Sequence, residues 1–279
     1  MRASFRYLGR GSWLAQRDPR VKLVVAALFV AGVIQLRDTR HLAVAFAIAL
    51  AYYATARIPL REVRLQWAYL TVVIVFVAGL NSVITGGRAG GFAQSEVHVL
   101  FVLPFGIAIT AEAISLSISQ ILRFLAMAAV SFPIAYSIAP GDMAVAFRRL
   151  GLGDRLSFAL DLTFRFLPTL VQEFSDTIDA QRVRGFEPIA RKGGPLHRIR
   201  RLAPVFVPVT VGSLAGAEDT IDAMDLRGFG TGKRVWYRQV QMDQASWAVT
   251  AAFAAILVLA TYLNLSGQSE HYLLPFLVP

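Results

Sequence analysis

The fold class follows from the stretch Ser246-Trp-Ala-Val-Thr-Ala-Ala-Phe-Ala-Ala-Ile-Leu-Val-Leu-Ala-Thr-Tyr-Leu-Asn-Leu265, which contains no charged residue. A helix of about 20 apolar residues can cross the hydrocarbon core of a bilayer, which is about 30 Å thick. Four more stretches resemble it: Leu23–Leu36, Leu42–Ala56, Trp67–Val83 and a longer, more polar one from Ala113 to Ile138. The 279 residues are 56% hydrophobic and 16% charged, far from the averages for soluble domains. We therefore predict an all-α polytopic membrane protein with about five transmembrane helices.

The basic residues are distributed unevenly along the chain. Fifteen of the 28 Lys and Arg residues lie between 140 and 240, none follows Arg238, and six precede the first apolar stretch: Arg2, Arg6, Arg10, Arg17, Arg20 and Lys22. The positive-inside rule then places the N-terminus, the loop at 57–66 and the block at 140–240 in the cytoplasm, and the C-terminus outside. Arg37 and Arg40 are a mild exception, because they would face outward. This distribution explains the net charge of +10 without a nucleic-acid partner.

Opposite sides for the two termini require an odd number of crossings. The remaining apolar segment, near 97–111, contains Leu103-Pro-Phe-Gly106, and proline with glycine is typical of a turn. We predict an extracytoplasmic or re-entrant hairpin there. The chain then divides into a membrane domain of about four spans at 1–139, a cytoplasmic domain at 140–240, and a C-terminal transmembrane helix with its tail at 241–279.

The cytoplasmic block reads as two long helices between the fourth and fifth spans. Apolar residues at intervals of three and four predict a helix with one packed face: Leu160, Phe164, Leu167, Val171, Phe174 and Ile178. Pro168 predicts a kink or an interruption in it. The second helix covers about 203–226, where Gly212 and Gly216 predict a close approach of two helix backbones.

Both predicted helices end on nearly the same phrase. Asp176-Thr-Ile-Asp-Ala-Gln-Arg-Val-Arg-Gly-Phe186 and Asp219-Thr-Ile-Asp-Ala-Met-Asp-Leu-Arg-Gly-Phe229 match at eight of eleven positions. The glycines predict left-handed caps of the Schellman type. A cation in the last turn also favours the helix dipole, but lysine would serve that purpose equally well. Arginine in both copies therefore indicates a forked guanidinium that binds a group such as a carboxylate on a partner.

Several kinds of chemistry find no support in the sequence. The chain has no cysteine, and its four histidines are scattered. Gly228-Phe-Gly-Thr-Gly-Lys233 fails the phosphate-binding Walker A pattern at two positions, because Arg227 stands where the first glycine belongs and Arg234 follows the lysine. We predict that the chain is not an enzyme, holds no metal or cofactor, and leaves any ATP to other subunits.

The paired Arg-Gly phrases resemble the transmembrane T component of energy-coupling factor (ECF) importers, the EcfT/CbiQ family. Weaker similarities support this over most of the chain: Asp18-Pro-Arg-Val-Lys22, Ile109-Thr-Ala-Glu112, Arg123-Phe-Leu125, Arg149-Leu-Gly151 and Arg165-Phe-Leu-Pro168. The resemblance implies coupling motifs at Val183-Arg184-Gly185 and Leu226-Arg227-Gly228, although the family commonly has alanine before the arginine.

The resemblance also implies partners and a mechanism. The two arginines would enter grooves on two ABC-type ATPase subunits, which bind the ATP. Other surfaces would hold a substrate-binding membrane S component in the cell membrane. Closure of the ATPases would then reorient the S component and import a vitamin or a transition-metal ion.

Two alternatives remain open at this stage. A membrane enzyme acting on a lipid or isoprenoid phosphate would use Arg184 and Arg227 with Asp179 and Asp222 as headgroup or metal ligands. A permease that carries substrate alone would need discontinuous helices at mid-membrane, whereas the repeat lies in the cytoplasmic block. Arg123, inside an apolar span, is expected to form a structural pair with Glu112 or a backbone carbonyl, or else to contact the S component.

Overall fold

The computed structural model describes residues 11–14, 16–85, 99–103, 107–186, 195–232 and 242–267. The chain forms two compact units. One comprises mainly Met143–Val240, and the other combines Arg6–Asp142 with Gln241–Pro279. The assignment of residues 140–240 to the cytoplasm and of the rest to the membrane stays a prediction.

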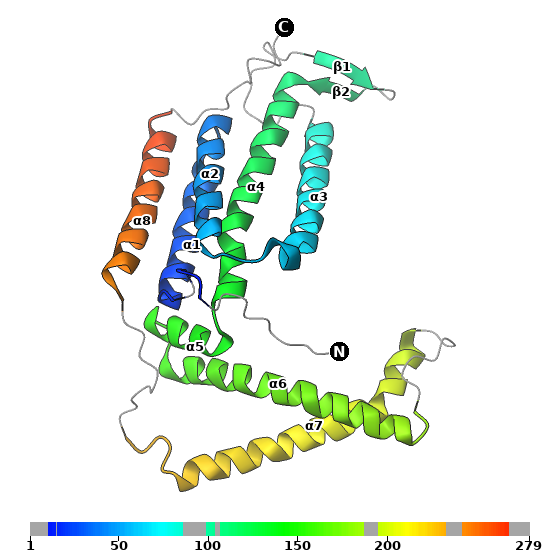
Figure 1. The fold of residues 1–279 in the computed structure, drawn as a ribbon. Coiled ribbons are helices and arrows are strands. Elements are labelled where there is room, and N and C mark those ends of the chain that lie inside the picture. The colour runs from blue at the N-terminus through cyan, green and yellow to red at the C-terminus, as the bar shows by residue number, and fades with distance from the viewer. Residues whose placement is uncertain are drawn as a thin grey trace. The chain divides into compact units, whose positions relative to one another are not determined.

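The larger unit contains five long helices and one small hairpin (Figure 1). The helices are α1 (Pro19–Gln35), α2 (Thr39–Thr55), α3 (Leu60–Thr85), α4 (Ala111–Ser137) and α8 (Gln244–Leu265). Strands β1 (Val99–Leu103) and β2 (Ile107–Thr110) pair antiparallel, while the prediction that this segment is an extracytoplasmic or re-entrant hairpin stays a prediction. The turn residues 104–106 lie outside the described residues.

Within the part of the chain that the structure describes, three helices are long and apolar enough to cross a membrane: Arg61–Asn81, Ala111–Ser137 and Gln244–Leu265. Helices α1 and α2 have 17 residues each, which corresponds to about 25 Å. The fold class, an all-α membrane protein, is confirmed. The count of five crossings stays a prediction, because it requires the two shorter helices to cross as well.

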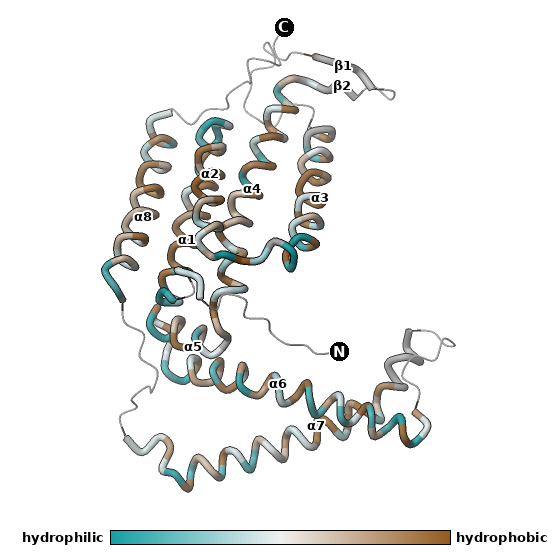
Figure 2. The backbone as a smooth tube through the Cα atoms, in the orientation of Figure 1, coloured by the Kyte–Doolittle hydropathy of each residue, from teal (hydrophilic) through white to brown (hydrophobic). Residues whose placement is uncertain are grey.

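The core of this unit joins the two ends of the sequence. Helix α8 packs on α1, where the Cα of Leu257 would lie 3.5 Å from a Cβ at Gly32. The ring of Phe253 on α8 lies 5.8 Å from that of Phe29 on α1 and 5.5 Å from that of Tyr52 on α2. By contrast, α3 exposes large apolar side chains, as expected for a lipid-facing surface: Leu65, Tyr69, Val72 and Phe76. Figure 2 shows the hydropathy of the residues along the helices of this unit.

Aspartate caps set where the first two helices begin. The Asp18 carboxylate accepts a hydrogen bond from the backbone N–H of Arg20 at 2.9 Å, and Pro19 occupies the first helical position. This confirms the start predicted from the sequence. Asp38 caps α2 in the same way, accepting from the N–H of Arg40 at 2.8 Å.

A buried lysine ties α1 to the end of α4. Lys22 is 1% exposed, and its Nζ donates a hydrogen bond of 2.9 Å to the backbone carbonyl of Ser137, the last residue of α4. The carboxylates of Asp142 and Asp18 stabilise the ammonium charge. A buried charge needs such partners, because burial without them is strongly unfavourable.

Arg123 on α4 has a structural partner. Its Nη2 donates a hydrogen bond of 2.6 Å to the backbone carbonyl of Leu36, the C-cap residue of α1. The expectation of a carbonyl partner is thereby confirmed. A contact with an S component is not tested.

The second unit consists mainly of helices α5 (Pro140–Arg149), α6 (Asp154–Val183) and α7 (Pro195–Leu226). Helix α5 was not expected as a separate element. It ends at a turn in which Gly151 has a positive φ of 107°. Helix α6 continues through Pro168, so this proline does not interrupt the helix, and the kink stays a prediction.

Helices α6 and α7 pack on each other and run in opposite directions (Figure 1). Ser213 on α7 donates a hydrogen bond of 3.2 Å to the carboxylate of Glu173 on α6. Gly212 and Gly216 do not mediate this packing, because a Cβ at either position would find no atom within 4 Å. The close approach predicted at these glycines is therefore not one to α6, and an approach to another subunit stays a prediction.

Candidate functional site

The end of α6 is a complete Schellman cap. Gly185 has a φ of 82°, its N–H donates to the carbonyl of Arg182 at 2.9 Å, and the N–H of Phe186 donates to the carbonyl of Gln181 at 3.0 Å. These are the two hydrogen bonds that define the motif. Arg184 occupies the C-cap position, immediately before the left-handed glycine. The predicted cap is confirmed.

The end of α7 repeats this cap bond for bond. Gly228 has a φ of 66°, and its N–H donates to the carbonyl of Asp225 at 2.9 Å. The N–H of Phe229 donates to the carbonyl of Met224 at 3.0 Å. Arg227 therefore takes the place that Arg184 has in the first copy. The two copies of the repeated sequence therefore adopt the same backbone structure.

Each cap presents an aliphatic side chain beside its arginine. Val183 is 90% exposed and Leu226 is 89% exposed, and both arginines are exposed as well. The described part of the chain therefore covers very little of either side chain. An aliphatic group next to a forked cation suits a partner groove with an apolar floor and a carboxylate. The sequence analysis identified Val183 and Leu226 only as positions where the family commonly has alanine, and it did not predict that their side chains are exposed.

The two arginines do not form one site. Because α6 and α7 are antiparallel, Arg184 and Arg227 lie at opposite ends of the helix pair (Figure 1). A single phosphate headgroup or metal ion held by both copies is inconsistent with this arrangement. Among the described residues, no group of three His, Cys, Asp or Glu side chains is placed to hold a metal ion. The geometry suits two separate docking points.

The aromatic residue that ends the second phrase has a further contact. The ring of Phe229 lies 4.8 Å from that of Phe158 in the first part of α6. The end of α7 is therefore attached to the beginning of α6. No sequence pattern indicates this pairing, because the two phenylalanines are remote in the chain.

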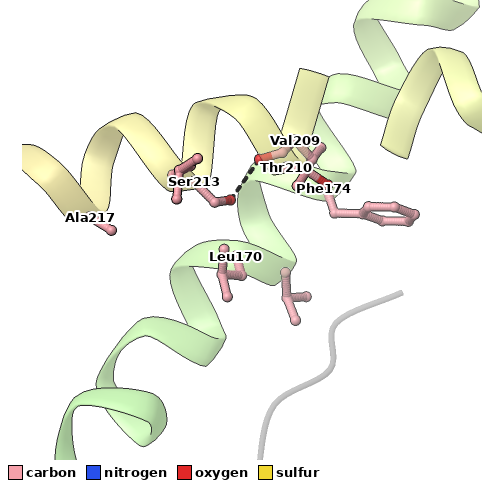
Figure 3. A pocket seen from close by; sticks show the side chains of 8 residues that line it. Leu170, Phe174, Val209, Thr210, Ser213 and Ala217 are labelled. Carbon is pink, nitrogen blue, oxygen red and sulfur yellow. Dashed lines mark hydrogen bonds between the residues drawn. The ribbon is translucent and has the colours of Figure 1, made fainter. Parts of the chain in front are cut away.

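The crossing of α6 and α7 leaves an apolar groove of about 610 Å³ (Figure 3). Leu170, Val171 and Phe174 line it from α6, and α7 contributes Val209, Thr210, Ser213, Leu214 and Ala217. The single hydroxyl proton of Ser213 is shared between the Glu173 carboxylate at 3.2 Å and the closer carbonyl of Val209 at 2.7 Å. The groove otherwise presents mainly carbon. Val171 and Phe174 belong to the stripe predicted for α6, and both are still about 40% exposed.

The apolar helices and the two exposed arginine ends define the class as a helical membrane protein with two separate candidate docking ends. Comparison with known proteins makes this specific. Residues 10–237 match the CbiQ family, described as cobalt transport protein, and the chain belongs to that family.

Curated relatives are similar to this chain over nearly its whole length. The chain is 26% identical over 269 residues to the energy-coupling factor transporter transmembrane protein EcfT of Bacillus selenitireducens, covering 92% of this chain and 96% of that protein. It is 27% identical to the EcfT protein of Staphylococcus aureus over the same shares. A putative ABC transporter ATP-binding protein of Bifidobacterium longum is 28% identical over 89% of this chain, which corresponds to 31% of that longer protein.

These findings confirm the resemblance and the class of function. The chain is a transmembrane component of an ECF-type importer. The alternative of a lipid-phosphate enzyme is wrong, because the family and the named relatives are transport proteins.

Proposed function

We propose that the chain couples two ABC-type ATPase subunits to a membrane S component through Arg184 and Arg227. The observation that carries this proposal is the pair of equivalent caps. Each ends a long helix, and each presents an exposed arginine beside an exposed aliphatic residue. Two equivalent ends suit two similar partners, and their location at opposite ends of the helix pair allows both to bind at once.

Two observations favour ATPases as these partners. The chain itself lacks a complete Walker A motif, so ATP must be bound elsewhere. In addition, the Bifidobacterium longum relative joins a segment similar to this chain to a longer protein named for ATP binding. A segment fused to an ATP-binding protein in one organism is a reasonable partner of such a protein in another.

The groove between α6 and α7 is the surface that we assign to the S component. An S component would meet this groove at the cytoplasmic surface of the membrane, where apolar side chains of the two subunits could pack against each other. The groove offers Leu170, Phe174 and Leu214 among its lining residues. Movement of the two docking ends would change the crossing of α6 and α7, and with it the shape of this groove. A vitamin or a transition-metal ion would be the imported substrate.

We further propose a cell-membrane location with the N-terminus and residues 140–240 in the cytoplasm and the C-terminus outside. The absence of native cysteine allows a direct check. Three single variants, Ser4→Cys, Ser175→Cys and Ser269→Cys, would be treated in intact cells with an impermeant maleimide. Only Ser269→Cys should be labelled, whereas permeabilised cells should show labelling of all three. Labelling of Ser4→Cys or Ser175→Cys in intact cells would contradict the proposed orientation.

The coupling role is tested by reversing the two cations. Arg184→Glu combined with Arg227→Glu should weaken co-purification with the ATPase subunits by at least about 100-fold and abolish uptake, because truncation of one partner in a hydrogen-bonded charge pair costs about 2–5 kcal/mol. The matched control is Arg61→Glu with Arg165→Glu, which makes the same charge change at exposed positions outside the two caps. The control should retain both properties. Normal uptake by the Arg184 and Arg227 double variant would overturn the proposal.

A further inference from the structure

The two docking ends differ in charge at one position of the repeated phrase. Three positions differ between the copies: Gln181 and Met224, Arg182 and Asp225, and Val183 and Leu226. Only the second pair changes the charge. Arg182 and Asp225 are exposed and lie two residues before the docking arginines.

The identical caps make this comparison direct. The carbonyl of Arg182 accepts from Gly185 and the carbonyl of Asp225 accepts from Gly228, both at 2.9 Å. The two side chains therefore leave the same point of the same backbone motif. A guanidinium group at one end has a carboxylate as its counterpart at the other.

The charge difference extends over the last three turns of each helix. Residues 175–184 carry two carboxylates and two guanidinium groups, with Arg182 paired to Asp179 at 2.9 Å, and have no net charge. Residues 218–227 carry four carboxylates and one guanidinium group, a net charge of −3: Glu218, Asp219, Asp222, Asp225 and Arg227. One end is neutral and the other is acidic.

Helix stability does not explain the acidic end. Carboxylates in the last turn lie beside the negative end of the helix dipole and destabilise it, whereas a cation such as Arg182 is favourable there. Asp225 therefore opposes the local preference that the first copy satisfies. An exposed residue that weakens its own helix end is expected to contribute to recognition.

We infer that the two ends select different partner surfaces, and that residues 182 and 225 determine the choice. Asp225 fits a partner groove whose rim carries lysine or arginine, while Arg182 fits a rim that carries a carboxylate. Like charges at such a rim oppose binding and exclude the wrong partner. The two ATPase subunits are accordingly non-identical, and each end docks on one of them. This inference rests on the proposed function.

The absence of cysteine provides the experiment. Ala180 and Ala223 occupy equivalent exposed positions, one turn before the docking arginines. Full-length chains with Ala180→Cys or Ala223→Cys would be expressed in the organism that encodes the protein. They would be labelled in its membranes with a thiol-directed photocrosslinker, and the captured chains identified by mass spectrometry. Two different ATP-binding subunits should be captured, one at each position.

A charge exchange then tests the determinant. Arg182→Asp combined with Asp225→Arg should reduce each original crosslink at least fivefold or exchange the two captured subunits. The matched control, Gln181→Met combined with Met224→Gln, exchanges an uncharged difference and should leave both crosslinks intact. Capture of the same subunit at both positions, or crosslinks unaffected by the charge exchange, would overturn the inference. Capture of no ATP-binding subunit at either position would instead contradict the proposed function on which it depends.

Discussion

Gly185 and Gly228 adopt the same left-handed backbone conformation, with φ angles of 82° and 66°, although 43 residues separate them in the chain. Each glycine turns the backbone immediately after an arginine, so that the arginine stands at the tip of its helix. An L-residue is disfavoured by about 1–2 kcal/mol in this conformation. The glycines therefore fix the direction in which Arg184 and Arg227 are presented.

Replacement of the first glycine isolates this backbone effect. Gly185→Ala should destabilise the end of α6 by about 1 kcal/mol, because a Cβ there has open space but a strained φ. Faster hydrogen exchange at the amide of Phe186 and weaker ATPase association would report it. Gly212→Ala is the control, since it adds a methyl group in open space at an ordinary helical φ and should stabilise α7 by about 0.5–1 kcal/mol. Effects of the same sign at both glycines would contradict the role of the left-handed cap.

Lysine at the docking positions separates charge from shape. Arg184→Lys combined with Arg227→Lys keeps both cations and both caps but removes the planar fork that binds a carboxylate through two hydrogen bonds. ATPase affinity should fall about tenfold or more, with the chain's melting temperature in detergent unchanged. An affinity equal to that of the native chain would show that a point charge is sufficient. The melting temperature serves as the internal control, because both arginines are exposed.

Loss of the buried lysine should destabilise the membrane unit. Lys22→Met removes the hydrogen bond to the Ser137 carbonyl and leaves Asp18 and Asp142 without that cation, at a cost of about 2–3 kcal/mol. A lower melting temperature in detergent is the expected measurement. Arg61→Met, which removes an exposed cation at the start of α3, should change stability by less than about 0.5 kcal/mol. Equal melting temperatures for the two variants would show that Lys22 is not a structural anchor.

Arg123 on α4 is expected to stabilise the fold and not to contribute to binding of the ATPases or the S component. Arg123→Leu leaves the Leu36 carbonyl without its donor in an apolar environment and should cost about 1–2 kcal/mol. The fraction that folds should still co-purify with the ATPases and the S component. Arg123→Lys retains a donor and should recover part of the stability. Normal stability with lost S-component binding would instead assign Arg123 to that interface.

Local sequence rules predicted the helix ends well, because the interactions there involve neighbouring residues. Asp18 and Pro19 predicted the start of α1, and Gly185 and Gly228 predicted the caps of α6 and α7. In these cases, a side chain or a backbone angle determines the structure within one turn. The hairpin at 97–111 was predicted for the same reason, from a proline and a glycine between two apolar runs.

Predictions that depend on distant partners were less successful. The spacing of Gly212 and Gly216 suits helix packing, but the face of α7 that meets α6 is the one carrying Val209 and Ser213. The contact between Phe158 and Phe229 depends on the antiparallel arrangement of two long helices. The exposure of Val183 and Leu226 likewise requires knowing that no other part of the described chain covers the caps. A single sequence contains no direct signal for such relationships.

The contact between Phe229 and Phe158 makes the two docking ends mechanically unequal. Phe229, two residues after Arg227, contacts Phe158 near the beginning of α6. Phe158 lies only a few residues after the turn that follows α5. Arg184 lies 26 residues along α6 from Phe158, about 39 Å, and α6 also packs on α7 over this length. A movement at the second cap would therefore reach the beginning of α6 over a shorter path than a movement at the first cap.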